Sequence, residues 1–423
     1  MVALHNIKKK ERSGTFMDNM RLPIHRWFRY SAGFSAEWVE TEIKKFETEH
    51  SQKAIILDPF LGSGTTSFAA CATNRKSFGF DGHPFIARIA KAKNLWHLNE
   101  SDFILACEEV LAQSKKIKKS TSRYKESNLL GKCYTFESLS KLDKLKEAYQ
   151  TLANEEEIWE LVRLNITSIL RACSKVGTAQ WQYILPRKSK AKVLDVEDAF
   201  IGKMKMMASD MKFAKNSNWS NSAKIYEHDI RYKTRSHKCN LLITSPPYPN
   251  NYDYADATRL EMMFWGEING WCDLKTTVRP SIMRSCSQHA SADKINLDDI
   301  LNEPLLGPII NELSPITDEL AKVRLTKGGK KTYHTMVAAY FLDMAKIWKN
   351  LRLIMSKGSK ICFVIGDSAP YGVHVPAEKW LAKLAAASGF RENSFEKLRD
   401  RNIKWKNRTH TVPLHEGRLW LEG

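Results

Sequence analysis

The sequence predicts a mixed α/β fold, in which a mainly parallel sheet is covered by helices on both faces. Short apolar runs at residues 54–57, 76–81, 223–230 and 240–245 alternate with helical segments, a pattern typical of parallel sheets. Between about residues 96 and 224, and again in 267–333, the pattern predicts two mainly helical insertions. The final stretch, 388–423, predicts a C-terminal antiparallel hairpin.

Composition narrows the class of partner. The chain has 423 residues, 43% of them hydrophobic, so a large core is expected. Its net charge of +19 favours a polyanionic partner, most simply nucleic acid. No apolar run reaches 18 residues and no signal-peptide pattern is present, so we expect a cytoplasmic protein without a membrane partner. The eight cysteines form no Cys-x-x-Cys pair and the twelve histidines show no metal-ligand spacing, so we expect reduced thiols and no metal.

The first segments lead into the predicted sheet. Residues 1–20 are polar, contain Lys8, Lys9 and Lys10, and are expected to form a flexible basic arm. The segment 21–46 begins irregularly and becomes an amphipathic helix after Phe34, where Ser35 can cap the helix.

A glycine-containing loop, DPFLGSGTT (58–66), follows the first strand and opens a helix. Its glycines allow close approach of a ligand to the free N–H groups of that helix. Asp81 ends the next strand 23 residues after Asp58, near the spacing at which an acid meets ribose hydroxyls. No Lys or Arg occurs from Asp58 to Cys71, which argues against a nucleoside triphosphate. An acid at Asp58 suits a cationic amino group, and S-adenosylmethionine fits this combination.

The later segments continue the alternation. The strand at 223–230 ends in HDI, and residues 340–368 predict a helix stopped at Gly358 and then a strand. Leu241, Leu242 and Ile243 predict the end of a buried strand that runs into TSPPY (244–248). The two prolines stop the ladder and fix two φ angles, so a hydroxyl and an aromatic ring are held stiffly at the edge of the sheet. This arrangement favours a reactive pocket.

Together, DPFLGSGTT, GFDGHP (79–84), HDI (228–230) and TSPPY resemble the S-adenosylmethionine-dependent DNA amino-methyltransferases. The resemblance covers about half of the chain and implies a Rossmann-like class I methyltransferase sheet. TSPPY is similar to the N4-cytosine subgroup, whereas N6-adenine enzymes more often carry Asp-Pro-Pro-Tyr. The block from His25 to Glu37 is similar to the first cofactor motif of the family.

The resemblance also implies roles for single residues. Gly62 and Gly64 would line the methionine portion of the cofactor, and Asp58 would face its amino group. Asp81 would hold the ribose hydroxyls and Asp229 the adenine amino group. The other residues expected at the cofactor are Phe34, Ser35, Phe60, Ser63, Thr65, Thr66, Gly82, Ile230 and Thr244. The chain has no Pro-Cys pair, so the covalent cysteine chemistry of cytosine-C5 enzymes is not expected.

TSPPY suits an exocyclic amine. Cytosine N4 is a poor nucleophile because its lone pair is delocalised into the ring. Ser245 Oγ and a backbone carbonyl, best that of Pro246, would accept hydrogen bonds from the two N–H groups of the amine. Pro246 and Pro247 would hold these acceptors rigidly. Tyr248 would stack on the flipped base, and stacking worth roughly 1–3 kcal/mol would offset much of the cost of flipping.

We expect a catalytic domain formed by residues 21–95, 225–266 and 334–423. The first insertion, 96–224, carries the basic runs SKKIKKSTSRYK (114–125) and PRKSKAK (186–192), which are candidates for phosphate contacts. The second insertion, 267–333, is the candidate target-recognition region, because the residues preceding it border the carboxyl ends of the strands. Double-stranded DNA is the expected partner, and the resemblance allows a cognate restriction endonuclease.

Two other functions stay open. One is adenine-N6 methylation of DNA, since Ser and Asp variants of the motif overlap. The other is a catalytically inactive nucleic-acid-binding module, although Asp58, Gly62, Gly64, Asp81 and Ser245 together argue against it. RNA or protein substrates have less support.

Overall fold

A seven-stranded sheet organises the computed structural model, which describes residues 16–30, 33–118, 125, 128–178, 184–234, 237–293, 295–328, 331–401 and 412–423. The strand order is β5-β2-β1-β6-β7-β9-β8. Neighbours from β5 to β7 are parallel, and β9 pairs antiparallel with both β7 and β8. The strands are β1 (Ile55–Asp58), β2 (Lys76–Asp81), β5 (Ala223–Glu227), β6 (Cys239–Thr244), β7 (Met355–Gly366), β8 (Arg391–Arg401) and β9 (Leu414–Glu422). The predicted parallel sheet and terminal hairpin are confirmed.

The sheet buries both of its faces. Along β6, Leu241 and Ile243 contribute to one core cluster and Leu242 to another, as expected when successive side chains alternate across a doubly covered sheet. The helices of the first face are α1 (Ala36–His50) and α2 (Thr65–Ala72). Those of the second face include α13 (Ile310–Arg324), α14 (Tyr333–Ile354) and α15 (Ala377–Ala387).

The register brings three strand ends to one edge. Asp58 of β1 pairs with Gly79 of β2, and Leu57 of β1 pairs with Leu242 of β6. Parallel strands point the same way, so the carboxyl ends of β1, β2 and β6 lie side by side. This is the edge at which ligands bind in open α/β sheets.

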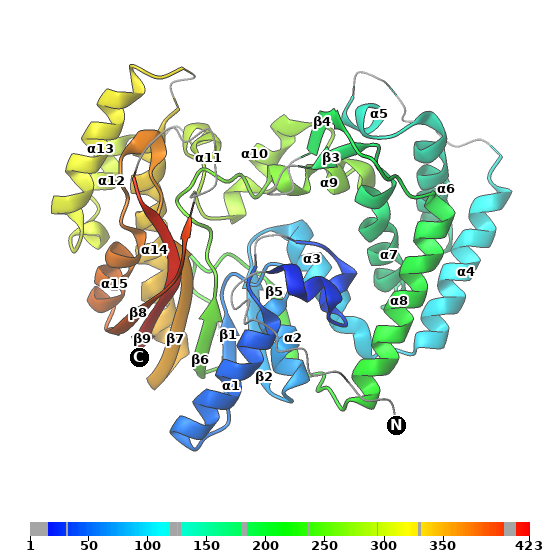
Figure 1. Ribbon diagram of the computed structural model, residues 1–423, viewed down its shortest axis with the longest axis horizontal. Coiled ribbons are helices and arrows are strands. Elements are labelled where there is room, and N and C mark those ends of the chain that lie inside the picture. Colours follow the sequence, from blue (N-terminus) through cyan, green and yellow to red (C-terminus); the bar gives the residue numbers. More distant parts are fainter. Residues whose placement is uncertain are drawn as a thin grey trace.

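A group of helices lies beside the sheet (Figure 1) and encloses a third core. It is built mainly by helices from residues 84–216 and by the residues after β6. The helices are α3 (Pro84–Lys93), α4 (Glu100–Lys116), α5 (Leu129–Cys133), α6 (Phe136–Leu152), α7 (Ile158–Cys173), α8 (Val196–Asn216) and α9 (Arg259–Trp265). A small antiparallel pair, β3 (Val176–Thr178) and β4 (Ile184–Ser189), interrupts them; the helical pattern did not predict it.

The remaining helices lie between β6 and β7 in the chain: α10 (Leu274–Thr277), α11 (Ser287–Ala292) and α12 (Leu297–Leu301). Among the described residues, no helix combines the length and hydrophobicity that a membrane crossing requires.

Some predicted boundaries are wrong. The strand predicted over 223–230 ends at Glu227, so HDI follows β5 and does not end it. Helix α14 ends at Ile354, four residues before the expected stop at Gly358. Gly358 instead lies within β7 with φ of 73°, and its N–H donates to the carbonyl of Gly423. Gly358 therefore adopts a left-handed backbone conformation where the chain bonds to Gly423, and it does not cap a helix.

Candidate active site

The ends of β1 and β6 are joined by hydrogen bonds between buried side chains. Thr244 Oγ1 donates to Asp58 Oδ1 over 2.6 Å, and the Phe60 N–H donates to the same carboxylate oxygen over 3.1 Å. One residue earlier on β6, the carbonyl of Ile243 accepts from Thr66 Oγ1 over 3.1 Å. The two sequence motifs DPFLGSGTT and TSPPY therefore form one structural unit.

The glycine loop curls around the end of β2. Gly62 and Gly64 have φ of 53° and 95°, which side chains rarely adopt. A Cβ at Gly64 would lie 2.3 Å from the ring of Phe68. The Gly62 N–H donates to Asp81 Oδ2 over 2.7 Å, and the His83 N–H donates to Asp81 Oδ1 over 2.8 Å. The loop and the acid after it are thus fixed to one another.

Asp58 and Asp81 are carboxyl groups without an ion-pair partner among the described residues. Burial raises the pKa of Asp58 to about 6 and that of Asp81 to about 7. Each Asp81 oxygen accepts one backbone N–H and keeps a lone pair for a further donor. Asp58 and Asp81 are two carboxyl groups at adjoining strand ends that lack a cationic partner among the described residues. They suit a ligand that carries a positive charge and hydroxyl groups, as S-adenosylmethionine does.

The loop is supported from behind by a lysine that sequence reasoning missed. Lys93, at the end of α3, is only 1% exposed, and its Nζ donates to the Ser63 carbonyl over 2.8 Å. The ammonium group also lies 4.7 Å from the centroid of the Phe68 ring. Burial lowers the pKa of Lys93 to about 7. The cation comes from outside 58–71, so the loop sequence alone does not reveal it. Ser63, Thr65 and Thr66 are themselves buried.

The predicted adenine end is already crowded with charge. Asp229 forms an ion pair with Arg231 over 2.6 Å, and Arg231 also reaches Asp343 over 3.2 Å. A Cβ at Gly82 would lie 1.9 Å from the carbonyl oxygen of Ser281, so the second insertion touches the backbone that follows Asp81. Ile230 is buried in the core that includes β2. An adenine amino group at Asp229 would share that carboxylate with Arg231.

Phe34 and Ser35 have structural contacts. Phe34 is 4% exposed, packs edge-on against Trp38 and belongs to the core between α1, α2 and the sheet. Ser35 caps α1 as predicted, because its hydroxyl accepts the Trp38 N–H over 3.3 Å. Packing and capping account for both residues, and their roles at a cofactor stay predictions.

Beyond Thr244, the TSPPY segment forms an aromatic site. The hydroxyl of Tyr340 donates to the Pro247 carbonyl over 2.8 Å. The Arg401 guanidinium lies 5.4 Å from the centroid of the Tyr248 ring. Ser245 and Tyr248 are both half-buried, and burial raises the pKa of the Tyr248 phenol. Arg401 and Tyr340 come from β8 and α14, and no sequence signal connected them to TSPPY.

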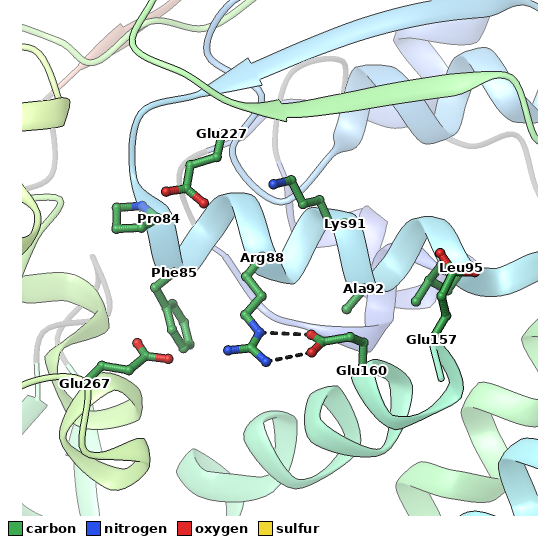
Figure 2. Close-up of a pocket in the computed structure, with 10 residues that line it drawn as sticks. All are labelled: Pro84, Phe85, Arg88, Lys91, Ala92, Leu95, Glu157, Glu160, Glu227 and Glu267. Atoms are coloured by element: carbon green, nitrogen blue, oxygen red, sulfur yellow. Dashed lines mark hydrogen bonds and ion pairs between the residues drawn. The ribbon is translucent and has the colours of Figure 1, made fainter. Parts of the chain in front are cut away.

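A separate pocket of about 490 Å³ lies beside α3 (Figure 2). Glu227 at the end of β5 and Pro84 at the start of α3 border it, and Arg88 pairs with Glu160 across it. Four glutamates line this pocket, a charge that disfavours nucleic-acid phosphates. TSPPY residues do not line it.

Residues 4–92 match the N6/N4 DNA methylase family. This part of the chain is similar to the N6/N4 DNA methylases. The match to this methylase family includes the glycine loop and Asp81 and stops before TSPPY.

Curated relatives extend the similarity over most of the chain. Type II methyltransferase M.BsoBI of Geobacillus stearothermophilus is 24% identical over 434 aligned positions, covering 92% of this chain and 82% of the relative. Type II methyltransferases M.AvaI of Nostoc sp. and of Anabaena variabilis are 23% identical over 408 positions, covering 89% of this chain and 81% of each relative. No solved structure matches.

Proposed function

We propose that the protein is a site-specific DNA methyltransferase that modifies the exocyclic N4 amine of a flipped cytosine, with S-adenosylmethionine as methyl donor. One observation carries the proposal: Thr244 of TSPPY donates to Asp58 of the glycine loop. The glycine loop, which suits a cationic cofactor, is thereby bonded directly to TSPPY, which suits the exocyclic amine of a base.

The cofactor side would be formed by buried carboxylates. Asp58 and Asp81 would hold the amino group and the ribose hydroxyls, and the left-handed Gly62 and Gly64 would let the loop backbone approach the ligand. When bound, S-adenosylmethionine supplies an electrophilic methyl group on a sulfonium. Burial of the acids strengthens their attraction for this cation, because the local dielectric constant is low.

The amine side would be formed by Ser245 and the Pro246 carbonyl. Each would accept one hydrogen of the amine and return electron density to the nitrogen. The neighbouring Pro247 carbonyl is fixed by Tyr340, which helps to hold the turn rigid. Tyr248 would stack on the base with one face while Arg401 lies on its ring. The proton released after transfer would pass to Ser245 or to solvent.

We further propose a place in a restriction–modification system, since the relatives are named type II methyltransferases. The net charge of +19 supports DNA as the partner. A cognate endonuclease would be the natural companion of such an enzyme.

Identification of the modified nucleoside tests the proposal. Plasmid DNA incubated with the protein and S-adenosylmethionine should yield N4-methylcytosine after digestion and mass spectrometry. N6-methyladenine would instead establish the adenine alternative. DNA binding without any methylated nucleoside would favour the inactive-module alternative. Ser245→Ala, which lacks one proposed acceptor, is the matched low-activity control.

A further inference from the structure

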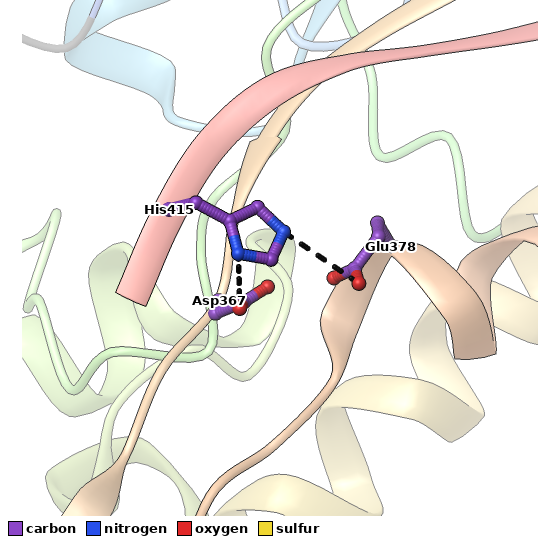
Figure 3. A group of neighbouring side chains, drawn as sticks. All are labelled: Asp367, Glu378 and His415. Carbon is purple, nitrogen blue, oxygen red and sulfur yellow. Dashed lines mark ion pairs between the residues drawn. The ribbon is translucent and has the colours of Figure 1, made fainter. Parts of the chain in front are cut away.

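Three side chains with metal-binding atoms converge at the carboxyl end of β7 (Figure 3). Asp367 follows β7, Glu378 lies in the first turn of α15, and His415 is the second residue of β9. One donor atom from each lies within 4.8 Å of the others. His415 Nδ1 is 2.9 Å from Asp367 Oδ2, and His415 Nε2 is 3.6 Å from Glu378 Oε1.

A second imidazole lies at the rim of this group. His374 Nε2 is 3.0 Å from Asp367 Oδ2. The bridge between Ser368 and Val375 folds the intervening loop back on itself, which brings His374 beside Asp367. The His374 side chain is 42% exposed, so it is the most accessible of the four.

The carboxylates of Asp367 and Glu378 are buried, and each has one oxygen without a hydrogen-bond donor among the described residues. The Asp367 side chain is 1% exposed and that of Glu378 is 10% exposed. These oxygens are Asp367 Oδ1 and Glu378 Oε2. Buried carboxylate oxygens that lack a donor are costly unless a hydrogen bond or a cation satisfies them.

We propose that Asp367, Glu378 and His415, with His374 as a fourth donor, bind a divalent transition-metal ion of the Zn²⁺ type. Imidazole nitrogen and carboxylate oxygen are the ligands that such ions share, whereas Mg²⁺ and Ca²⁺ select oxygen alone. Zinc bonds to these atoms are about 2.0–2.2 Å long, so donors of one ion lie at most about 4 Å apart. Small side-chain rotations would bring the observed group into that range.

The ion would have a structural role at the wall of the TSPPY site. Gly366, the residue before Asp367, lies against Tyr248: a Cβ there would be 3.2 Å from the Tyr248 ring. The Asp367 carbonyl accepts from Arg401 over 2.7 Å. An ion held by Asp367, Glu378 and His415 would tie β7, α15 and β9 together next to that ring. The assignment is independent of which base is methylated.

Titration calorimetry with Zn²⁺ and Mn²⁺ tests the site on full-length protein stripped with a chelator. We expect one Zn²⁺ per chain and a Zn²⁺-dependent rise in melting temperature. His415→Gln and Glu378→Gln should each weaken binding at least about 10- to 100-fold and remove the rise. His50→Gln is the matched control, because it removes an exposed imidazole on α1 outside the group and should leave binding unchanged.

Co²⁺ substitution adds a readout that does not depend on stability. The wild type should show d–d absorption, and His415→Gln should lose it. A wild-type protein that binds neither Zn²⁺ nor Mn²⁺ with a Kd below about 100 µM overturns the proposal. Equal Zn²⁺ affinity in wild type, His415→Gln and Glu378→Gln also overturns it, since the ion would then lie elsewhere.

Discussion

Thr244, at the end of β6, donates its hydroxyl hydrogen to Asp58, at the end of β1, over 2.6 Å, and both residues are almost completely buried. The bond crosses 186 residues of sequence. A disturbance on one side of this pair should therefore be felt on the other.

Thr244→Val removes this donor while keeping the shape of the side chain. Asp58 Oδ1 would lose this bond and keep the one from the Phe60 N–H, so the free energy of unfolding should fall by about 1–3 kcal/mol and S-adenosylmethionine should bind more weakly. Thermal melting and calorimetry measure the two effects. Thr167→Val, which removes a buried threonine hydroxyl in α7, should cost stability alone. Equal cofactor affinity in both variants would contradict the proposed role of Asp58.

Cofactor affinity should depend on pH through Asp58 and Asp81. Their pKa values, about 6 and about 7, are raised above those of an unfolded chain. The ligand-free fold therefore holds extra protons between about pH 4 and pH 7, and these groups lower its stability as the pH rises through that window. A cationic ligand prefers the ionised acids, so affinity should increase from about pH 5.5 to pH 7.5 with release of protons. Calorimetry in buffers of different ionisation enthalpy measures that release.

Asp81→Asn should flatten part of this pH profile, because one titrating group is removed while the side-chain shape is kept. Affinity that does not vary with pH in the wild type would mean that neither acid faces a cationic ligand.

Ser245→Ala should reduce single-turnover methylation by about 10²–10³-fold, since one preorganised acceptor is removed from the reacting amine. S-adenosylmethionine binding should be preserved. Tyr248→Ala should lower both DNA affinity and rate, and Tyr248→Phe should be milder because the stacking face remains. Tyr340→Phe, which frees the Pro247 carbonyl, should have an intermediate effect. A stable Ser245→Ala protein with the wild-type rate would exclude Ser245 as the acceptor.

The basic run at 186–192 offers a test of phosphate binding. Arg187, Lys188 and Lys192 are exposed, whereas Lys190 Nζ donates to the carbonyls of Arg171 and Ala172 over 2.9 Å each. Neutralising the first three should flatten the dependence of log K on log salt by about 0.9 for each phosphate that the protein no longer binds, without changing the preferred sequence. Lys190→Gln is the control and should reduce stability with little change in that slope. If the slope is the same in all of these variants, the basic run at 186–192 is solvated surface that does not bind phosphates.

In the other predicted basic run, 114–125, one lysine already has a partner within the chain. Lys115 pairs with Glu197 over 2.6 Å, and residues 119–124 lie outside the described residues, as do residues 1–15 of the predicted arm.

The strands, the Ser35 cap and the terminal hairpin could be predicted from local patterns. The meeting of Asp58, Asp81 and Thr244 followed from them, because parallel strands bring their carboxyl ends to one edge. The β3–β4 pair was missed because β3 has only three residues and no turn signal marked the pair. Contacts such as Arg401 on Tyr248 depend on how a distant strand packs, and single-sequence periodicity contains no such information.

The residues of the proposed metal site illustrate the same limit. Asp367, Glu378 and His415 are separated by 11 and 37 residues, and no ligand motif has that spacing. Their proximity depends on β9 returning antiparallel to β7, with Ile365 opposite Gly417. Only the folded chain turns these three positions into neighbours.

The close approach of Gly82 to Ser281 would limit how the proposed methyltransferase could change its DNA target in evolution. Any side chain at position 82 would collide with the Ser281 backbone, so residues 267–333 are not an interchangeable cassette. A transplanted segment would have to reproduce the same close approach or displace the strand end that carries Asp81. If residues 267–333 read the DNA target, as the sequence predicts, new sequence preferences should arise more readily by single substitutions within this segment than by exchange of the whole segment.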